Sequence, residues 1–142
     1  MPYTIDRVDV WAGAIKDRPG GMLKVLESLA NAGANLEFVI ARRKKKGTGL
    51  IFVAPLKGRK QTKAAKQKGL AKAESLQSLR VEGTDKAGLG ARITCALAEA
   101  GLNVRGLSAA ALGKKSVVYL AFDSRADSTK ARKVLKKALR IK

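Results

Sequence analysis

Asp17-Arg18-Pro19-Gly20-Gly21-Met22-Leu23 leads into an apolar helical pattern that ends at Ala32-Gly33-Ala34-Asn35-Leu36. The same design returns further along the chain, where Asp85-Lys86-Ala87-Gly88-Leu89-Gly90 leads into a helical pattern that ends at Ala100-Gly101-Leu102-Asn103-Val104. The copies align without a gap through identical pairs: Asp17/Asp85, Gly20/Gly88, Leu29/Leu97, Ala30/Ala98, Ala32/Ala100, Gly33/Gly101 and Asn35/Asn103. This agreement at one register indicates an internal repeat.

The start of each repeat has the features of a helix start. Pro19 suits the first turn of a helix, and the carboxylate of Asp17 is placed to accept hydrogen bonds from the first free amides. Apolar residues then recur every three or four positions, which predicts one buried stripe on a helix. Gly33 is expected to end this helix in a left-handed conformation.

The segment before the repeat predicts a strand. Within residues 5–15 the sequence alternates with a period of two from Val8 onward, with Val8 and Val10 on one face and Trp11 on the other. There Trp11 covers the sheet, contributes to an interface or forms part of a ligand wall. The rest of the first copy predicts a strand over 36–41, a hairpin connection over 42–49, a strand over 50–54, a helix over 57–68 and a short strand over 70–73.

The second copy repeats this order. It predicts a strand over 76–82, a helix over 88–100, strands over 103–110 and 116–122, and a helix over 128–139 that begins at Ser128. Only residues 140–142 remain for a last strand, which is therefore expected to be short or absent. Each copy thus predicts an α+β unit of ferredoxin-like βαββαβ order, with both helices on one face of an antiparallel sheet. We expect domains over 1–74 and 75–142, joined side by side into one eight-stranded sheet.

The charge of the chain is strongly positive. The 30 Lys and Arg residues exceed the 11 Asp and Glu residues and give a net charge of +19 that is spread over both halves. Such a field attracts nucleic acid, anionic membrane surfaces or acidic metabolites. Lys46-Gly47-Thr48-Gly49-Leu50-Ile51-Phe52-Val53 partly matches the RNA-recognition signature. Its stacking positions lack aromatic residues, however, and Phe52 is expected on the opposite face.

Several chemistries find no support in the sequence. The chain has no histidine, and its one cysteine, Cys95, lies in an apolar helical pattern and is expected to be buried. No metal site, cofactor or catalytic motif is therefore predicted, and the glycine spacing does not match a P-loop. No apolar run is long enough to cross a membrane, and the first residues do not resemble a signal peptide. We expect a cytoplasmic protein that is not an enzyme.

The repeated pattern resembles the ACT domain, a small regulatory module. The resemblance rests on Asp-x-Pro-Gly, the apolar helix and the Ala-Gly-x-Asn-Leu/Val ending, and two consecutive copies cover nearly the whole chain. It implies an allosteric protein whose domains pair and bind an amino acid or similar small carboxylate effector at the pairing interface. A homodimer is expected, with a partner enzyme as a further possibility and no membrane association.

The resemblance also implies which residues line the ligand sites. The first wall comprises Arg18, Pro19, Gly20, Gly21, Met22, Asn35 and Leu36. The second comprises Lys86, Ala87, Gly88, Leu89, Gly90, Asn103 and Val104. Free amides at a helix start suit a carboxylate, and glycines let it approach closely. The second copy has Ala87 in place of the proline, so the first copy is the stronger candidate.

Two alternatives stay open at this point. The Asp-Pro-Gly segment and Asn35 are also compatible with a purely structural role, as helix-start and strand-start residues. The other alternative is a basic protein that associates with nucleic acid through its lysine-rich helix and the cationic hairpin, formed by Arg42, Arg43, Lys44, Lys45 and Lys46.

Overall fold

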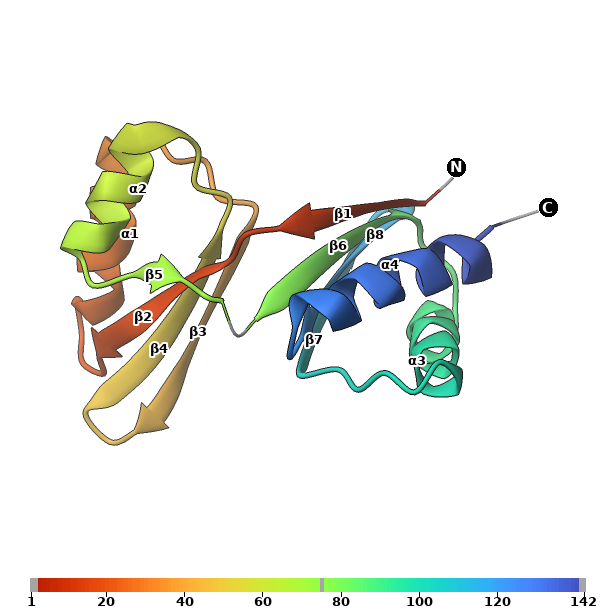
Figure 1. Cartoon of the computed structure of the whole chain (residues 1–142). Helices are drawn as coiled ribbons and strands as arrows, with labels where there is room; N and C mark the ends of the chain where they lie inside the picture. The colour runs from red at the N-terminus through yellow and green to blue at the C-terminus, as the bar shows by residue number, and fades with distance from the viewer. Residues whose placement is uncertain (1–2, 75, 141–142) are drawn as a thin grey trace. The chain divides into compact units, whose positions relative to one another are not determined.

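The computed structural model describes residues 3–74 and 76–140. These residues divide into two compact units (Figure 1). One unit comprises residues 9–73. The other comprises residues 3–8 together with the described residues from 74 onward.

The unit of residues 9–73 is a complete ferredoxin-like layer pair. Its elements are β2 Trp11–Lys16, α1 Gly21–Asn31, β3 Phe38–Lys45, β4 Thr48–Ala54, α2 Gly58–Gln67 and β5 Ala71–Lys72. The strands form an antiparallel sheet in the order β3-β4-β2-β5. Apolar residues of α1 and α2 pack against the inner face of this sheet, so both helices cover one face.

Trp11 belongs to the core of this unit. Its side chain is 8% exposed and clusters with Ile51 and Val53 of β4 beneath the helices. The face of β2 that carries Trp11 is therefore the buried face of this sheet, and Val10, which precedes the strand, is buried as well. Because Trp11 is enclosed by aliphatic residues, it serves packing in this unit.

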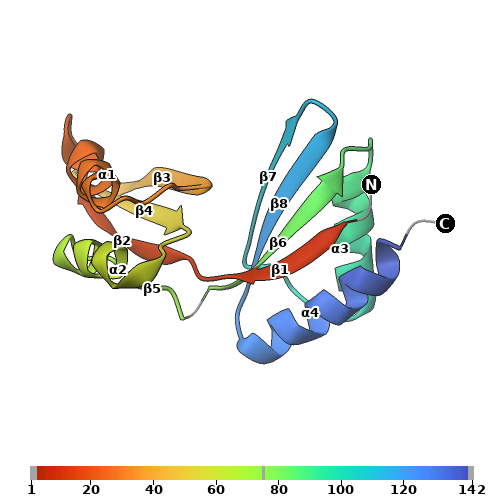
Figure 2. The same cartoon turned by 90° about the horizontal axis from the view of Figure 1, so that it is seen from above.

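The other unit has the same architecture but takes one strand from the beginning of the chain. Its elements are β1 Thr4–Val8, β6 Gln77–Thr84, α3 Leu89–Glu99, β7 Gly106–Leu112, β8 Lys115–Phe122 and α4 Arg125–Ala138. The strand order is β1-β6-β8-β7, and all neighbours are antiparallel (Figure 2). Ile5 of β1 lies opposite Val81 and joins a core with Leu79, Leu120 and Phe122.

Two predictions are corrected by the placement of β1 in the sheet of the later unit. The single strand predicted over 5–15 is two strands that belong to different sheets, because pairing changes between Val8 and Trp11. The domain division at 74/75 therefore fails for the first strand, which completes the unit that otherwise lacks a fourth strand. The α+β ferredoxin-like class is confirmed. Within the described residues, however, the eight strands form two four-stranded sheets and not one continuous sheet.

Three local predictions are also wrong. Residues 42–45 continue β3, because an edge strand can direct charged side chains into solvent, and the turn is confined to residues 46–47. Helix α4 begins earlier than expected, with Ser124 as its N-cap, while Ser128 is fully buried inside the helix. Cys95 is exposed, because the buried stripe of α3 runs through Leu89, Ile93 and Leu97.

Candidate ligand-binding sites

The loop between β2 and α1 is shaped by backbone contacts. The amide of Arg18 donates to the carbonyl of Lys16 at 3.0 Å, and the amide of Gly21 donates to the carbonyl of Arg18 at 3.0 Å. Gly20 caps α1 with φ of 86°, a left-handed conformation that favours glycine. No side chain of the described residues caps this helix. The prediction that Asp17 caps it is wrong, because the Asp17 carboxylate pairs with Arg43.

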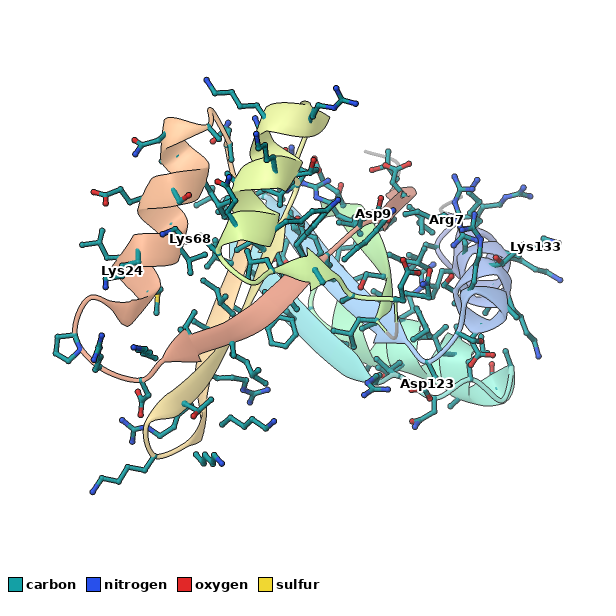
Figure 3. All side chains as sticks on the ribbon, turned by 60° about the vertical axis from the view of Figure 1, so that its left-hand side comes forward. Arg7, Asp9, Lys24, Lys68, Asp123 and Lys133 are labelled. Carbon is teal, nitrogen blue, oxygen red and sulfur yellow. The ribbon has the colours of Figure 1, made fainter. Side chains whose placement is uncertain are left out.

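A pocket of about 440 Å³ opens beside this loop. It brings the predicted residues Arg18, Pro19, Gly20 and Gly21 together with Ala14, Ile15, Lys16, Lys24, Val25 and Lys68. Figure 3 labels Lys24 on α1 and Lys68 just after α2, two of the four cations around this pocket. No ion pair within the described chain involves any of the four. The pocket is therefore suited to an anionic group.

The remaining predicted residues of the first wall lie elsewhere. Met22 is 43% exposed and does not line the pocket, and neither do Asn35 and Leu36. Leu36 packs against the core of its unit. Helix α1 has 11 residues, so a rise of about 1.5 Å per residue separates Asn35 from Gly20 by roughly the length of the helix. A small ligand in this pocket therefore does not reach Asn35 of the same helix.

Of the lining residues that the sequence analysis missed, three are cationic. Lys24 lies one helical turn after Gly20, so helical periodicity could have placed it near the loop. Lys16 is the last residue of β2, and its carbonyl accepts from the loop. Lys68 follows α2, and only the packing of α2 beside α1 brings it to the pocket.

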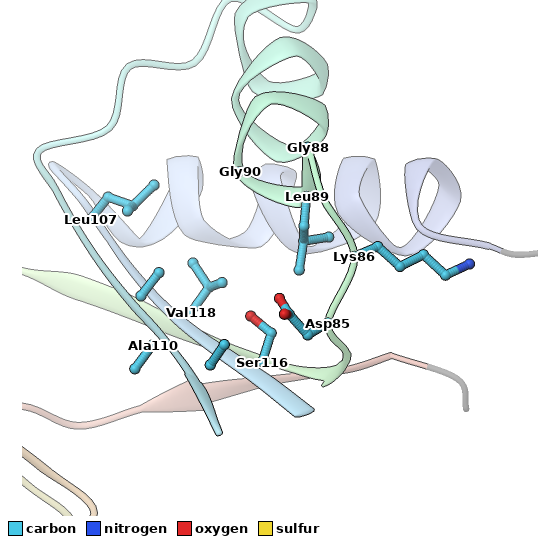
Figure 4. A pocket seen from close by; sticks show the side chains of 11 residues that line it. Asp85, Lys86, Gly88, Leu89, Gly90, Leu107, Ala110, Ser116 and Val118 are labelled. Atoms are coloured by element: carbon cyan, nitrogen blue, oxygen red, sulfur yellow. The ribbon is translucent and has the colours of Figure 1, made fainter. Parts of the chain in front are cut away.

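The equivalent loop of the other unit forms a smaller pocket. Gly88 caps α3 with φ of 85°, and the amide of Asp85 donates to the carbonyl of Lys114 at 2.8 Å. The pocket has a volume of about 250 Å³ and is largely apolar (Figure 4). It includes the predicted Lys86, Gly88, Leu89 and Gly90 and adds Asp85, Leu107, Ala109, Ala110, Ala111, Ser116 and Val118. The Lys86 side chain points away from the cavity in Figure 4.

The other residues predicted for the second wall do not line this pocket. Ala87 and Asn103 are exposed outside it, and Val104 packs against the core. Most of the added residues come from the hairpin of β7 and β8. Sequence spacing alone does not show that this hairpin faces the start of α3, since that proximity depends on the sheet order.

The cationic hairpin predicted for nucleic acid lies at the β3–β4 connection. Arg42, Arg43, Lys44, Lys45 and Lys46 are exposed, and no acidic residue occurs between positions 38 and 73. The strand alternation places Phe52 on the same face as Thr48 and Leu50, so the prediction that placed it on the opposite face is wrong.

No helix in the described chain is long and apolar enough to span a membrane.

Several solved structures share this fold. The chain is similar to a protein from Bacteroides thetaiotaomicron, with a TM-score of 0.73, 16% identity and coverage of 94% of this chain and 89% of that chain. It is similar to the regulatory subunit of aspartate kinase from Thermus thermophilus, with a TM-score of 0.67, 16% identity and coverage of 99% and 98%.

Full-length enzymes contain the same fold as one part. Aspartate kinase of Clostridium acetobutylicum matches 97% of this chain over 34% of its own length, with a TM-score of 0.63 and 15% identity. The sequence itself matches no protein-family model and no curated protein. The ACT-like fold expected from the repeat is therefore confirmed, and it is the fold of aspartate kinase regulatory subunits.

Proposed function

We propose that this chain is a non-catalytic regulatory protein that binds an amino acid or a similar small carboxylate in the pocket before α1. The observation that carries this proposal is the convergence of Lys16, Arg18, Lys24 and Lys68 on the open start of that helix. Cations without internal partners attract an anionic ligand, and the first amides of a helix add hydrogen-bond donors. The regulatory subunits that share the fold support the same assignment.

The proposed site is completed by a second copy of the chain. Asn35 and Leu36 lie at the far end of α1 from the glycines, so the second copy supplies them if they contact the ligand. An effector bound between two copies stabilises the dimer relative to the monomer. The free energy of ligand binding is thereby linked to assembly, which is the basis of an allosteric output.

A ligand screen on the full chain tests the proposal. The twenty amino acids and small dicarboxylates are added singly, and the melting temperature is measured. A ligand at 100 times its Kd should raise the free energy of unfolding by about 2.7 kcal/mol. Sedimentation with and without the ligand then reports whether binding promotes a dimer. If no carboxylate stabilises the chain, the proposal is wrong.

Charge-matched variants localise the site. Replacing Arg18 and Lys24 with alanine should weaken ligand binding at least tenfold. Replacing Lys60 and Lys63, two exposed cations of α2 outside the pocket, removes the same charge and should have little effect. Asn35→Ala should also weaken binding if a second copy of the chain completes the site. Equal losses in both double variants would point to a general electrostatic effect and not to this pocket.

A binding experiment with DNA and RNA tests the nucleic-acid alternative. Binding of DNA or RNA through the cationic hairpin would weaken steeply with salt and would depend on Arg42 and Lys44. Such binding, without stabilisation by any small carboxylate, would favour that alternative. A chain that acts only as a subunit of a partner enzyme would show neither response and would purify with that enzyme.

A further inference from the structure

The second helix of each unit carries much of the positive charge of the chain. The first helices are close to neutral, because α1 has one lysine and one glutamate and α3 has one arginine and one glutamate. Helix α2 has four cations and no acidic residue. Helix α4 has six cations and a single carboxylate, that of Asp127 in its first turn. Charge is therefore arranged by helix and is not spread evenly over each unit.

On each of these two helices, four cations lie on one face. At 3.6 residues per turn, each set of four falls within about 120° of arc. The α2 face comprises Arg59, Lys60, Lys63 and Lys66, and the α4 face comprises Lys130, Lys133, Lys136 and Lys137. All of these residues are exposed, and Figure 3 shows Lys133 extending from α4 away from its unit. The opposite side of each helix is buried, through Ala65 in α2 and Leu135 in α4.

The cations of both faces lack anionic partners within the described residues. No ion pair there involves any of them. Lys130 donates to the carbonyl of Ala100 at 2.9 Å, a neutral partner that leaves its charge uncompensated. Like charges three or four positions apart repel on a helix, as between Lys60 and Lys63 or between Lys133 and Lys137. A bound polyanion would remove this repulsion.

The surroundings of the two faces favour one kind of polyanion. Single-stranded nucleic acid binds by stacking its bases on aromatic side chains, and none of the aromatic residues of this chain is exposed. A helix that binds a membrane inserts its apolar side into the lipid, but here the apolar sides of α2 and α4 are buried in the cores. The faces are therefore suited to the outside of a nucleic-acid duplex.

The dimensions of a DNA duplex match these faces. Helix α2 has 10 residues and is about 15 Å long, and B-DNA carries one negative charge per about 1.7 Å of its axis. The four cations of one face therefore lie over about nine phosphate charges. Duplex RNA is recognised partly through its 2′-hydroxyl groups, for which a face made of cations alone has no acceptor.

We propose that the α2 and α4 faces bind the phosphate backbone of double-stranded DNA without reading its sequence. Both units have this face, whereas the cationic hairpin of β3 and β4 has no full counterpart. The β7–β8 turn has only Lys114 and Lys115, and Lys115 pairs with Glu82 at 2.7 Å. This inference goes beyond the proposed effector site, since no residue of either face lines the pocket before α1.

Binding of a labelled duplex to the full chain tests the partner. Two duplexes of unrelated sequence should bind with the same Kd, about 10⁻⁶ to 10⁻⁴ M at physiological salt, as expected for contacts to phosphates alone. The competitors are single-stranded DNA, duplex RNA and phosphatidylserine-rich vesicles. Tighter binding of any competitor, or no saturable binding of the duplex at low salt, would overturn the proposal.

Substitutions on the two faces test which residues contact the phosphates. K60A/K63A and K133A/K137A should each weaken duplex binding about fivefold or more. Each should also reduce the slope of log K against log salt by about 2, because each lost phosphate contact contributes about 0.9. Arginine at the same positions keeps the charge and should retain the slope. Alanine favours an exposed helix, so the melting temperatures should not fall.

A charge-matched variant of the hairpin distinguishes these faces from a general effect of net charge. R42A/K44A removes the same charge from the unit of residues 9–73 and should change the duplex affinity less than about twofold. A loss as large as that of K60A/K63A would show that binding follows net charge or the hairpin, and the assignment to the helices would be wrong.

The effector proposal and this inference fail separately. K60A/K63A should lose duplex affinity and keep any stabilisation by a carboxylate, while alanine at Arg18 and Lys24 should have the reverse effect. Loss of duplex affinity in both helix variants, without a carboxylate ligand in the screen, would support this inference alone. Unchanged duplex affinity in both helix variants would overturn it and leave the effector proposal intact.

Discussion

Gly21 shows how one missing side chain controls the geometry of the first pocket. An added Cβ at this position would lie 2.0 Å from the carbonyl oxygen of Lys16. The start of α1 therefore approaches the end of β2 more closely than any other residue type allows. This contact sets the position of the loop that carries Arg18 and Gly20.

We predict that Gly21→Ala destabilises the chain by about 1–3 kcal/mol, because the backbone must shift to relieve the clash. Gly90→Ala is the matched control in α3, where an added Cβ meets nothing within 4 Å. That substitution should stabilise the helix by about 0.5–1 kcal/mol, since alanine is the better helix former. Urea unfolding monitored by circular dichroism measures both. A stable G21A chain would show that the close approach is not required.

At the scale of single elements, α4 is positioned by polar contacts at its first turn. The hydroxyl of Ser124 accepts from the amide of Asp127 at 3.1 Å, which satisfies one free donor of the helix. Ser128 is fully buried and accepts from Arg7 Nη1 at 2.9 Å. The helix is thereby joined both to its own start and to β1.

Removing the cap should weaken this helix. We predict that Ser124→Ala lowers the free energy of unfolding by about 1 kcal/mol, the usual effect of losing an N-cap side chain. Arg125→Ala, at the next position in the exposed first turn, serves as the control and should have little effect. Hydrogen exchange of α4 amides should increase in the first variant only. Equal exchange in both variants would contradict a capping role.

At the scale of the whole molecule, the beginning of the chain stabilises the unit that contains its end. Ile5 is 3% exposed and belongs to the core formed by β6, β8, α3 and α4. The first strand is thus separated in sequence from every strand of its own sheet. The unit of residues 9–73 is continuous in sequence and has its own core.

This organisation predicts that the two units respond to different core substitutions. Ile5→Ala should destabilise the unit with β1 by about 2–4 kcal/mol through the cavity it leaves. Trp11, the one tryptophan of the chain, reports only on the unit of residues 9–73. The midpoint of its fluorescence transition should therefore be unchanged in I5A and should move to a lower denaturant concentration in Leu29→Ala. Circular dichroism should detect the loss of stability in both variants. A shifted fluorescence transition in I5A would show that the units unfold together.

The sequence by itself determined the repeat, the type of nearly every element and the two helix-start loops. These features depend on local chemistry: apolar spacing makes a helix amphipathic, and glycine alone suits a left-handed cap such as Gly20 or Gly88. The same signals selected Arg18, Gly20, Lys86 and Gly88, which line the two pockets.

Only the tertiary structure decided what lies across from those loops and which strands share a sheet. A period of two in residues 5–15 shows a strand but not its partner, because β1 and β2 present the same alternation while pairing in different sheets. For the same reason, spacing could not place Ser116 beside Asp85, or Lys68 beside Gly20. Those proximities arise from the packing of distant elements, and they give the two repeated loops pockets with different linings.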